Sequence, residues 1–193
     1  SPQFYKLMPM AMASGFDRVF EIAPVFRANP SFTLRHDTEF TSVDVEMSWI
    51  DSHDAVMQFE EQWLTAILTH VSETFADRIK STFDTEVVVP ELPFPSIPMA
   101  HAQQIVSDSG HRNERNGDLD PAGERILSEH IQKEFGHEFV FVIDYPVDVR
   151  PFYHMRMEDE PGLTKSFDLL WKGLEVTTGA QREQRLDRLE TQA

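Results

Sequence analysis

Apolar and polar residues alternate in part along two stretches near the N-terminus, residues 18–26 and 39–50. Alternation combined with β-branched and aromatic residues is typical of half-buried strands. The pattern therefore predicts an antiparallel strand pair joined by a long connection, and long loops in compact domains are usually functional or disordered. Residues 2–14 have a helical composition, although Pro9 would remove one backbone donor.

Apolar residues at spacings of three and four predict the clearest helix of the chain, from residue 51 to about residue 75. Asp51 or Ser52 can cap its first turn. The apolar stripe consists of Val56, Phe59, Trp63, Ile67, Val71 and Phe75.

Prolines between residues 87 and 98 predict an extended connector, and a short helix is expected at 100–107. Asp120 and Pro121 then form a cap and a first helical position, which predicts another helix. Residues 139–143 (FVFVI) read as a buried strand, and further strands are expected at 151–157, 164–171 and 173–178. This order predicts an α+β fold with a mostly antiparallel sheet flanked by helices, in one domain over residues 1–193.

The chain has 193 residues, no cysteine and a formal net charge of −16, from 17 Lys and Arg against 33 Asp and Glu. The absence of cysteine excludes a disulfide scaffold and fits a reducing compartment, so a cytoplasmic location is expected. No apolar run is long enough to span a bilayer, and residues 1–12 do not read as a signal peptide. The negative charge disfavours non-specific binding to nucleic acid, so contact with RNA would need a local patch or another part of the protein.

Cationic side chains gather in the connection between the first two predicted strands. Arg27 ends one strand, and Arg35 and His36 precede the next. A guanidinium fork matches phosphate oxygens, and the ring of Phe40 offers a flat face to a base, so this group suits a nucleoside triphosphate. The alternative is a solvated loop whose arginines offset nearby acids.

Two carboxylates, Asp168 and Glu175, stand seven residues apart on neighbouring predicted strands. Such a pair can hold Mg²⁺, which prefers oxygen ligands and usually keeps substrate phosphates as others. Arg182 follows a turn of small residues that permits close approach to a ligand. Ordinary surface carboxylates are the alternative. Metal-binding HExxH spacing and the phosphate-binding glycine motifs are missing from the sequence.

Gln3 and Lys6 are three residues apart, so one helical turn would aim both side chains in the same direction. The lysine would suit a carboxylate as a point charge. A surface lysine beside a glutamine is the alternative.

Together, in this order, these segments resemble class II aminoacyl-tRNA synthetases, in particular the aspartyl type found in archaea. SPQFYK resembles the amino-acid-binding segment of that family, and residues 18–49 resemble its second class-defining motif, a strand, a loop and a strand. DYPVDVRPFYHMR and SFDLLWKGLEVTTGAQR are similar to its later catalytic strands. The RANPSF form of the loop is similar to bacterial members that charge both tRNA(Asp) and tRNA(Asn).

The resemblance implies that L-aspartate is activated with ATP and Mg²⁺ and attached to tRNA(Asp). It leaves open whether tRNA(Asn) is a second acceptor. The implied ATP-binding residues are Arg27, Asn29, Arg35, His36, Asp37, Phe40 and Glu175. The implied aspartate-binding residues are Gln3, Lys6, Arg27, Asp44, Thr178 and Arg182. Asp168 and Glu175 would bind Mg²⁺, and the implied catalytic residues are Arg27, Glu175 and Arg182.

In this assignment Lys6 and Arg182 bind the side-chain carboxylate of aspartate, and Asp44 binds the ammonium group. Two cations favour aspartate over the uncharged asparagine, which would leave buried charge unmatched. Asn29 departs from the glutamate that is usual in the family, and the segment around Pro9 is longer than the family pattern.

The first and third class motifs and the anticodon-binding domain of the family have no counterpart in residues 1–193. The sequence is therefore expected to be an internal part of a catalytic domain from a homodimeric enzyme, with little or no activity by itself. Two other readings remain open: a tRNA-independent paralogue similar to asparagine synthetase, and a non-catalytic fragment that only binds a partner.

Overall fold

The computed structural model describes residues 8–28 and 38–193. The chain forms two compact units, Ser1–Asp51 and Ser52–Ala193, and each is described by itself.

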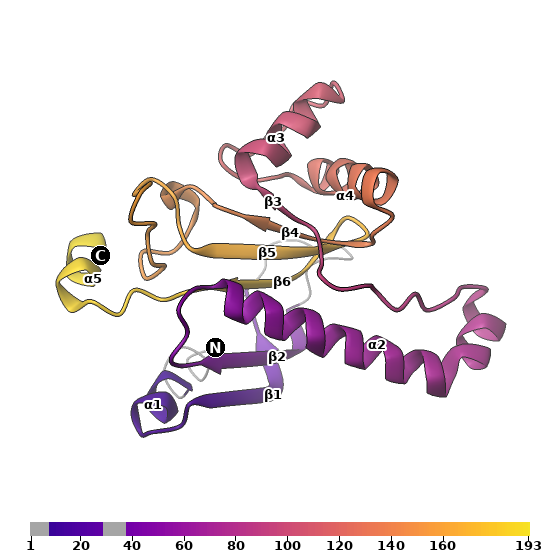
Figure 1. Ribbon diagram of the computed structural model, residues 1–193, viewed down its shortest axis with the longest axis horizontal. Coiled ribbons are helices and arrows are strands. Elements are labelled where there is room, and N and C mark those ends of the chain that lie inside the picture. The colour runs from indigo at the N-terminus through magenta and orange to yellow at the C-terminus, as the bar shows by residue number, and fades with distance from the viewer. Residues whose placement is uncertain (1–7, 29–37) are drawn as a thin grey trace. The chain divides into compact units, whose positions relative to one another are not determined.

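The first unit contains one short helix and a two-stranded antiparallel sheet (Figure 1). Its elements are α1 (Met8–Ala13), β1 (Arg18–Phe26) and β2 (Glu39–Met47). The strands pair in register from Arg18 opposite Met47 to Phe26 opposite Glu39, which confirms the predicted strand pair. Pro9 is the second residue of α1, a position whose N–H has no partner within a helix, so it is compatible with the helix.

The second unit is built on a four-stranded sheet with the order β3-β4-β5-β6. The strands are β3 (Ser96–Pro98), β4 (Phe139–Ile143), β5 (Ser166–Trp171) and β6 (Leu174–Ala180). β3 is parallel to β4 and the other neighbours are antiparallel, so the predicted α+β fold with a mostly antiparallel sheet is confirmed. Residues 151–157 do not form the expected strand. They make only the isolated bridges His154–Arg182 and Arg156–Thr164, because the turns around them interrupt the ladder.

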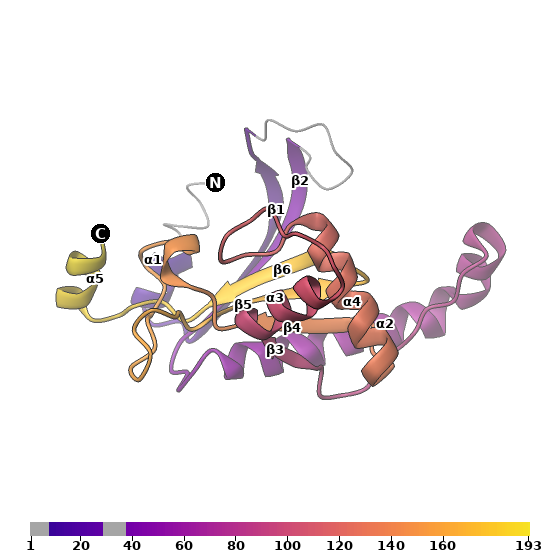
Figure 2. The same cartoon turned by 90° about the horizontal axis from the view of Figure 1, so that it is seen from above.

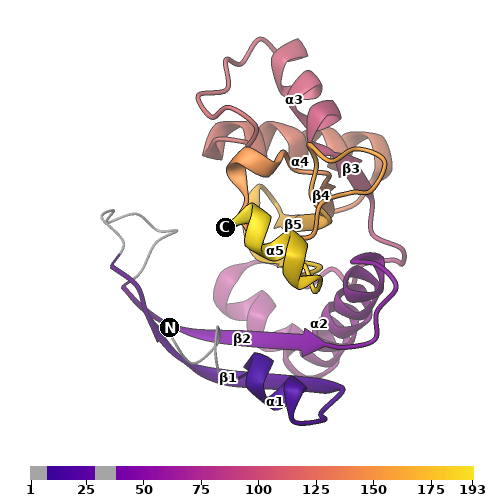
Figure 3. The same ribbon diagram turned by 90° about the vertical axis from the view of Figure 1, so that its left-hand side faces the viewer.

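Helices cover both faces of this sheet (Figures 2 and 3). They are α2 (Asp54–Phe83), α3 (Met99–Asp108) and α4 (Pro121–Phe135), and α5 (Leu186–Gln192) follows the sheet. On one face, Met57 of α2 packs with Phe139, Phe141, Phe167 and Leu169. On the other face, α3 and α4 pack in a second cluster that includes Val140, Val142 and Leu170. Successive residues of β5 therefore alternate between an α2 face and an α3–α4 face.

The helix predicted from Asp120 and Pro121 begins as expected. The Asp120 carboxylate accepts hydrogen bonds from the backbone N–H groups of Ala122 and Gly123. Gly136 ends α4 in the left-handed conformation, with φ 67°.

The apolar stripe predicted for α2 is wrong in its second half. The buried residues are Met57, Glu60 and Glu61, whereas Ile67 and Phe75 are 39% and 43% exposed. A stripe with steps of four residues rotates by about 40° per step around a helix with 3.6 residues per turn, so it leaves the sheet-facing side. The second half of α2 also extends past the end of the sheet (Figures 1 and 2). Across the described residues, no helix is long and apolar enough to cross a membrane.

Candidate active site on two sheet faces

One face of the β1–β2 pair collects the polar groups of the first unit. Phe40 lies opposite Val25 and Asp44 lies opposite Glu21. Opposite residues in an antiparallel pair project from the same face, so Phe40 and Asp44 share this face with Glu21. Arg27 continues the same alternation beyond β1. Its guanidinium carbon lies 5.8 Å from the centre of the Phe40 ring.

The charges on this face are separated along the strands. Asp44 and Glu21 lie at one end, and Asp44 accepts a hydrogen bond from the Ser42 hydroxyl at 3.1 Å. Phe40 and Arg27 lie at the other end, about 13 Å away for four residues of strand. The arrangement suits a ligand with a positive amine at one end and a ring and an anion at the other. The contribution of Glu21 was not predicted, because it depends on the register between the strands.

Gln3, Lys6, Asn29, Arg35, His36 and Asp37 lie outside the described residues.

In the second unit, a β-bulge brings the two predicted metal ligands to one face. Asp168 lies opposite Thr178, but the register then shifts so that Leu170 lies opposite Glu175 and Val176 has no partner residue on β5. A bulge re-aims the side chains beyond it. Glu175 therefore projects from the same α3–α4 face as Asp168 and Thr178, rather than from the α2 face.

Arg150 holds the Asp168 carboxylate from one side. Its Nη2 lies 2.6 Å from Asp168 Oδ2, and the two side chains are only 12% and 8% exposed. The guanidinium carbon lies 3.5 Å from the centre of the Tyr145 ring, and Nη1 lies 3.5 Å from the Thr178 hydroxyl. Asp168 Oδ1 is buried and has no hydrogen-bond partner in the described part of the chain. Arg150 thus fixes one oxygen of this carboxylate, which also lies beside the Tyr145 side chain, and Oδ1 is an enclosed acceptor.

The surroundings of Glu175 favour a bound cation. The side chain of Glu175 is exposed in part. Its pKa is nevertheless raised to about 7, first because the surrounding protein removes water from the carboxyl group and then by the charges of Asp168 and Glu124. The charge of Arg150 opposes this shift. A carboxylate whose pKa is raised by neighbouring acidic groups is stabilised by a nearby cation. In residues 8–28 and 38–193, no group of three or more His, Asp or Glu side chains is placed to hold a metal. Asp168 and Glu175 fit Mg²⁺ only as a pair of hard oxygen donors, completed by oxygens of a substrate and water.

Arg182 continues the same face beyond β6. Its backbone bridges to His154, and its guanidinium carbon lies 5.2 Å from the centre of the Tyr153 ring. Burial, then the charges of Arg150 and Arg182, lower the pKa of His154 to about 4, so the imidazole is neutral at neutral pH. This part of the face therefore offers the Thr178 hydroxyl and the Arg182 cation to an anionic group.

Sequence reasoning did not find Arg150, Tyr145 or His154. They lie in the segment after β4, DYPVDVRPFYHMR, whose resemblance to a later catalytic strand of the family was the available signal. Tyr145 is 2% exposed.

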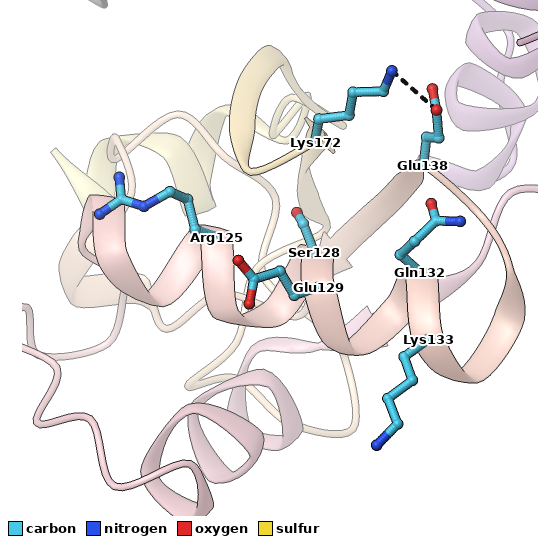
Figure 4. Close-up of a pocket in the computed structure, with 7 residues that line it drawn as sticks. All are labelled: Arg125, Ser128, Glu129, Gln132, Lys133, Glu138 and Lys172. Carbon is cyan, nitrogen blue, oxygen red and sulfur yellow. Dashed lines mark ion pairs between the residues drawn. The ribbon is translucent and has the colours of Figure 1, made fainter.

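A separate open hollow of about 510 Å³ lies beside α4 (Figure 4). It is lined by Arg125, Ser128, Glu129, Gln132, Lys133, Glu138 and Lys172. Lys172 is paired with Glu138 at 3.0 Å, while Arg125 and Lys133 point away from each other. None of the predicted site residues lines this hollow.

Comparison with known proteins identifies the family. Residues 1–192 match the family described as tRNA synthetases class II (D, K and N). The Aspartate--tRNA(Asp/Asn) ligase of Aeropyrum pernix is 44% identical over 98% of this chain and 42% of its own length. The Aspartate--tRNA(Asp) ligase of Pyrococcus abyssi is 39% identical over 97% of this chain and 42% of its own length.

Solved structures agree with this assignment. The aspartyl tRNA synthetase from Entamoeba histolytica has a TM-score of 0.89 and 31% identity, over 100% of this chain and 40% of that chain. Asparaginyl-tRNA synthetase from Pyrococcus horikoshii, complexed with asparaginyl-adenylate, has a TM-score of 0.85 and 30% identity, over 100% and 43%. The chain spans about two fifths of the length of these relatives, and it belongs to the class II tRNA synthetases of the D, K and N group.

Proposed function

We propose that the protein carrying this chain activates L-aspartate with ATP to aspartyl-adenylate and transfers the aspartyl group to tRNA(Asp). The relatives named above support this proposal, since they are aspartate–tRNA ligases. One structural observation carries the choice among the three amino acids of the family. Arg182 places a cation on the same face as Thr178, which favours a side-chain carboxylate over the neutral side chain of asparagine and the positive side chain of lysine.

The nucleotide is assigned to the β1–β2 face. The ring of Phe40 stacks on adenine, and Arg27 binds the α-phosphate and the α-carboxylate of aspartate. Arg35 and His36 bind the outer phosphates. Asn29 and Asp37 complete the ATP-binding set.

The aspartate-binding residues are assigned from the family resemblance. Asp44 binds the ammonium group, and the anionic character that Glu21 adds to that end of the face supports this role. Lys6 and Arg182 bind the side-chain carboxylate, and Gln3 and Thr178 orient the amino acid by hydrogen bonds.

Asp168 and Glu175 would hold Mg²⁺. The metal would neutralise phosphate charge and orient the phosphate groups. The buried Oδ1 of Asp168 and the raised pKa of Glu175 support this assignment.

Activation needs no nucleophile from the protein. An oxygen of the aspartate α-carboxylate attacks the α-phosphorus of ATP, the bond to the pyrophosphate oxygen breaks, and pyrophosphate leaves. The 3′-terminal ribose hydroxyl of tRNA then attacks the acyl carbon, and AMP leaves. Positioning and the fixed charge of Arg27 supply the rate enhancement, because both act where negative charge develops.

The relatives differ in the tRNA named, since one is an Asp/Asn ligase and another an Asp ligase. A charging assay with tRNA(Asn) and with tRNA(Asp) will show which of these two specificities this protein has. We also propose that the full-length protein forms a homodimer and is located in the cytoplasm.

The test is ATP–pyrophosphate exchange by the full-length gene product that contains this chain. Aspartate should support exchange and asparagine should fail by a factor on the order of 10⁴, because a site built for a charged group rejects the neutral analogue. Arg182→Met and Lys6→Met should raise KM for aspartate more than KM for ATP. Arg188→Met, which removes an exposed cation paired with Glu158, is the control and should change neither. Equal exchange with asparagine would refute the aspartate assignment.

A further inference from the structure

On the face of β6 that is turned toward α2, a side-chain hydrogen bond joins the strand to this helix. Thr177 and Gly179 project from this face, opposite Leu169 and Phe167. The Phe167 ring lies directly over Gly179, where an added Cβ would come within 2.3 Å of it. Gly179 therefore permits close packing against Phe167 but contributes no side chain, and Thr177 supplies a hydrogen bond from this face of β6 to α2.

Thr177 is anchored by a buried carboxyl group. Its hydroxyl donates a short hydrogen bond to Glu60 Oε1 of α2. Glu60 is 7% exposed and lies on the sheet-facing side of the helix, one turn after Met57. A buried carboxyl group is costly unless it has a hydrogen-bond partner, so the pair stays together.

This hydrogen bond lies beside the bulge that orients Glu175. Val176 is the residue without a partner on β5, and Thr177 is the first residue after it. A slip of the strand by one residue would remove the bulge, turn Glu175 away from Asp168 and leave Glu60 without its partner. Two features oppose such a slip: the contact of Gly179 with Phe167, where a residue with a Cβ would clash, and the buried hydrogen bond, which would leave Glu60 without its partner.

We infer that Glu60 is a positioning residue for the active site. Through Thr177 it holds the bulge at Val176, and the bulge keeps Glu175 on the face of Asp168 and Thr178. The inference rests on the proposed function in one respect, namely that Asp168 and Glu175 form the Mg²⁺ site.

The test compares variants of this pair in the full-length gene product. Thr177→Val removes the hydroxyl but keeps the β-branched shape, and Glu60→Met removes the carboxyl group. Both should weaken Mg²⁺ binding about 10- to 100-fold, as expected when a group that supports a metal ligand is lost. The measurement is calorimetric titration of Mg²⁺ into protein with a non-hydrolysable ATP analogue, so it does not depend on turnover.

Conservative variants should restore binding. Thr177→Ser keeps the hydroxyl and Glu60→Gln keeps an acceptor oxygen, so both should bind Mg²⁺ like the unchanged protein.

Glu61 offers a matched control on the same helix turn. It is 8% exposed, and its carboxylate accepts a hydrogen bond at 3.1 Å from the backbone N–H of Phe94, in the connector rather than in β6. Glu61→Met should lower the unfolding temperature and leave Mg²⁺ binding unchanged.

Two results would overturn the inference: unchanged Mg²⁺ binding in Thr177→Val, or equal weakening in Glu61→Met. If Glu60→Met does not fold, Thr177→Val carries the test alone because its shape is conserved. Failure of the proposed function is a different result. In that case the unchanged protein shows no aspartate-dependent pyrophosphate exchange, while the Mg²⁺ titrations can still be compared.

Discussion

Replacing Arg150 by methionine tests the electrostatic description of the site. The substitution keeps much of the side-chain volume but removes the cation that contacts Asp168 at 2.6 Å. Asp168 then stays buried beside Glu175 without this partner. Breaking a buried ion pair by removing one partner costs about 3–5 kcal/mol, because the remaining charge is uncompensated.

The lower end of that range is expected here. The pKa of Glu175 is about 7, so this carboxyl group can take up a proton and relieve part of the repulsion. We therefore expect a loss of about 3 kcal/mol. The urea unfolding midpoint should fall by this loss divided by the m-value, which is measured on the unchanged protein.

The assay is urea unfolding of the full-length gene product, followed by circular dichroism, with EDTA and again with excess Mg²⁺. Mg²⁺ should recover part of the loss in Arg150→Met and should stabilise the unchanged protein less, because only the variant lacks the internal cation. Arg188→Met is the control, since a surface ion pair contributes about 0–1 kcal/mol. A loss below about 1 kcal/mol in Arg150→Met, or equal stabilisation of both proteins by Mg²⁺, would show that Arg150 does not neutralise a buried charge.

Two further predictions concern the nucleotide and the buried carboxyl group of α2. Arg27→Ala should slow aspartate-dependent pyrophosphate exchange about 10²-fold or more, because it removes a fixed charge from the developing negative charge; an unchanged rate would contradict the assignment of Arg27. Burial raises the pKa of Glu60 from 4.5 to about 7, against the opposing hydrogen bond from Thr177. A raised folded-state pKa means that Glu60 stabilises the fold below pH 4.5 and loses this contribution as the pH rises through 7. The unfolding temperature of Glu60→Gln should therefore fall less between pH 4.5 and pH 7 than that of the unchanged protein. Parallel curves of unfolding temperature against pH for the two proteins would contradict the prediction.

The parts of the fold that follow from local sequence were predictable. Asp120 followed by Pro121 specifies the start of α4 through a side-chain cap and a fixed φ, and both depend only on neighbouring residues. The β1–β2 pair was predictable from alternation, because each strand has one half-buried face.

The parts that depend on partner elements were not predictable. The bulge at Val176 follows from the register against β5, and no property of Leu174–Ala180 alone shows it. The pairing of Arg150 with Asp168 joins residues 18 positions apart. The rotation of the α2 stripe, by contrast, follows from its spacing in steps of four residues and could have been read from the sequence. The amino-acid preference came from the motif resemblance, and the structure adds the face on which Arg182 lies.

A crystal structure of the full-length gene product with a non-hydrolysable aspartyl-adenylate analogue and Mg²⁺ would locate every group of the proposed site in one experiment. We expect adenine stacked on Phe40, the ammonium group beside Asp44, the side-chain carboxylate on Arg182, and Mg²⁺ bound by Glu175. An analogue bound with its side-chain carboxylate away from Arg182, or with adenine away from Phe40, would overturn the proposed function.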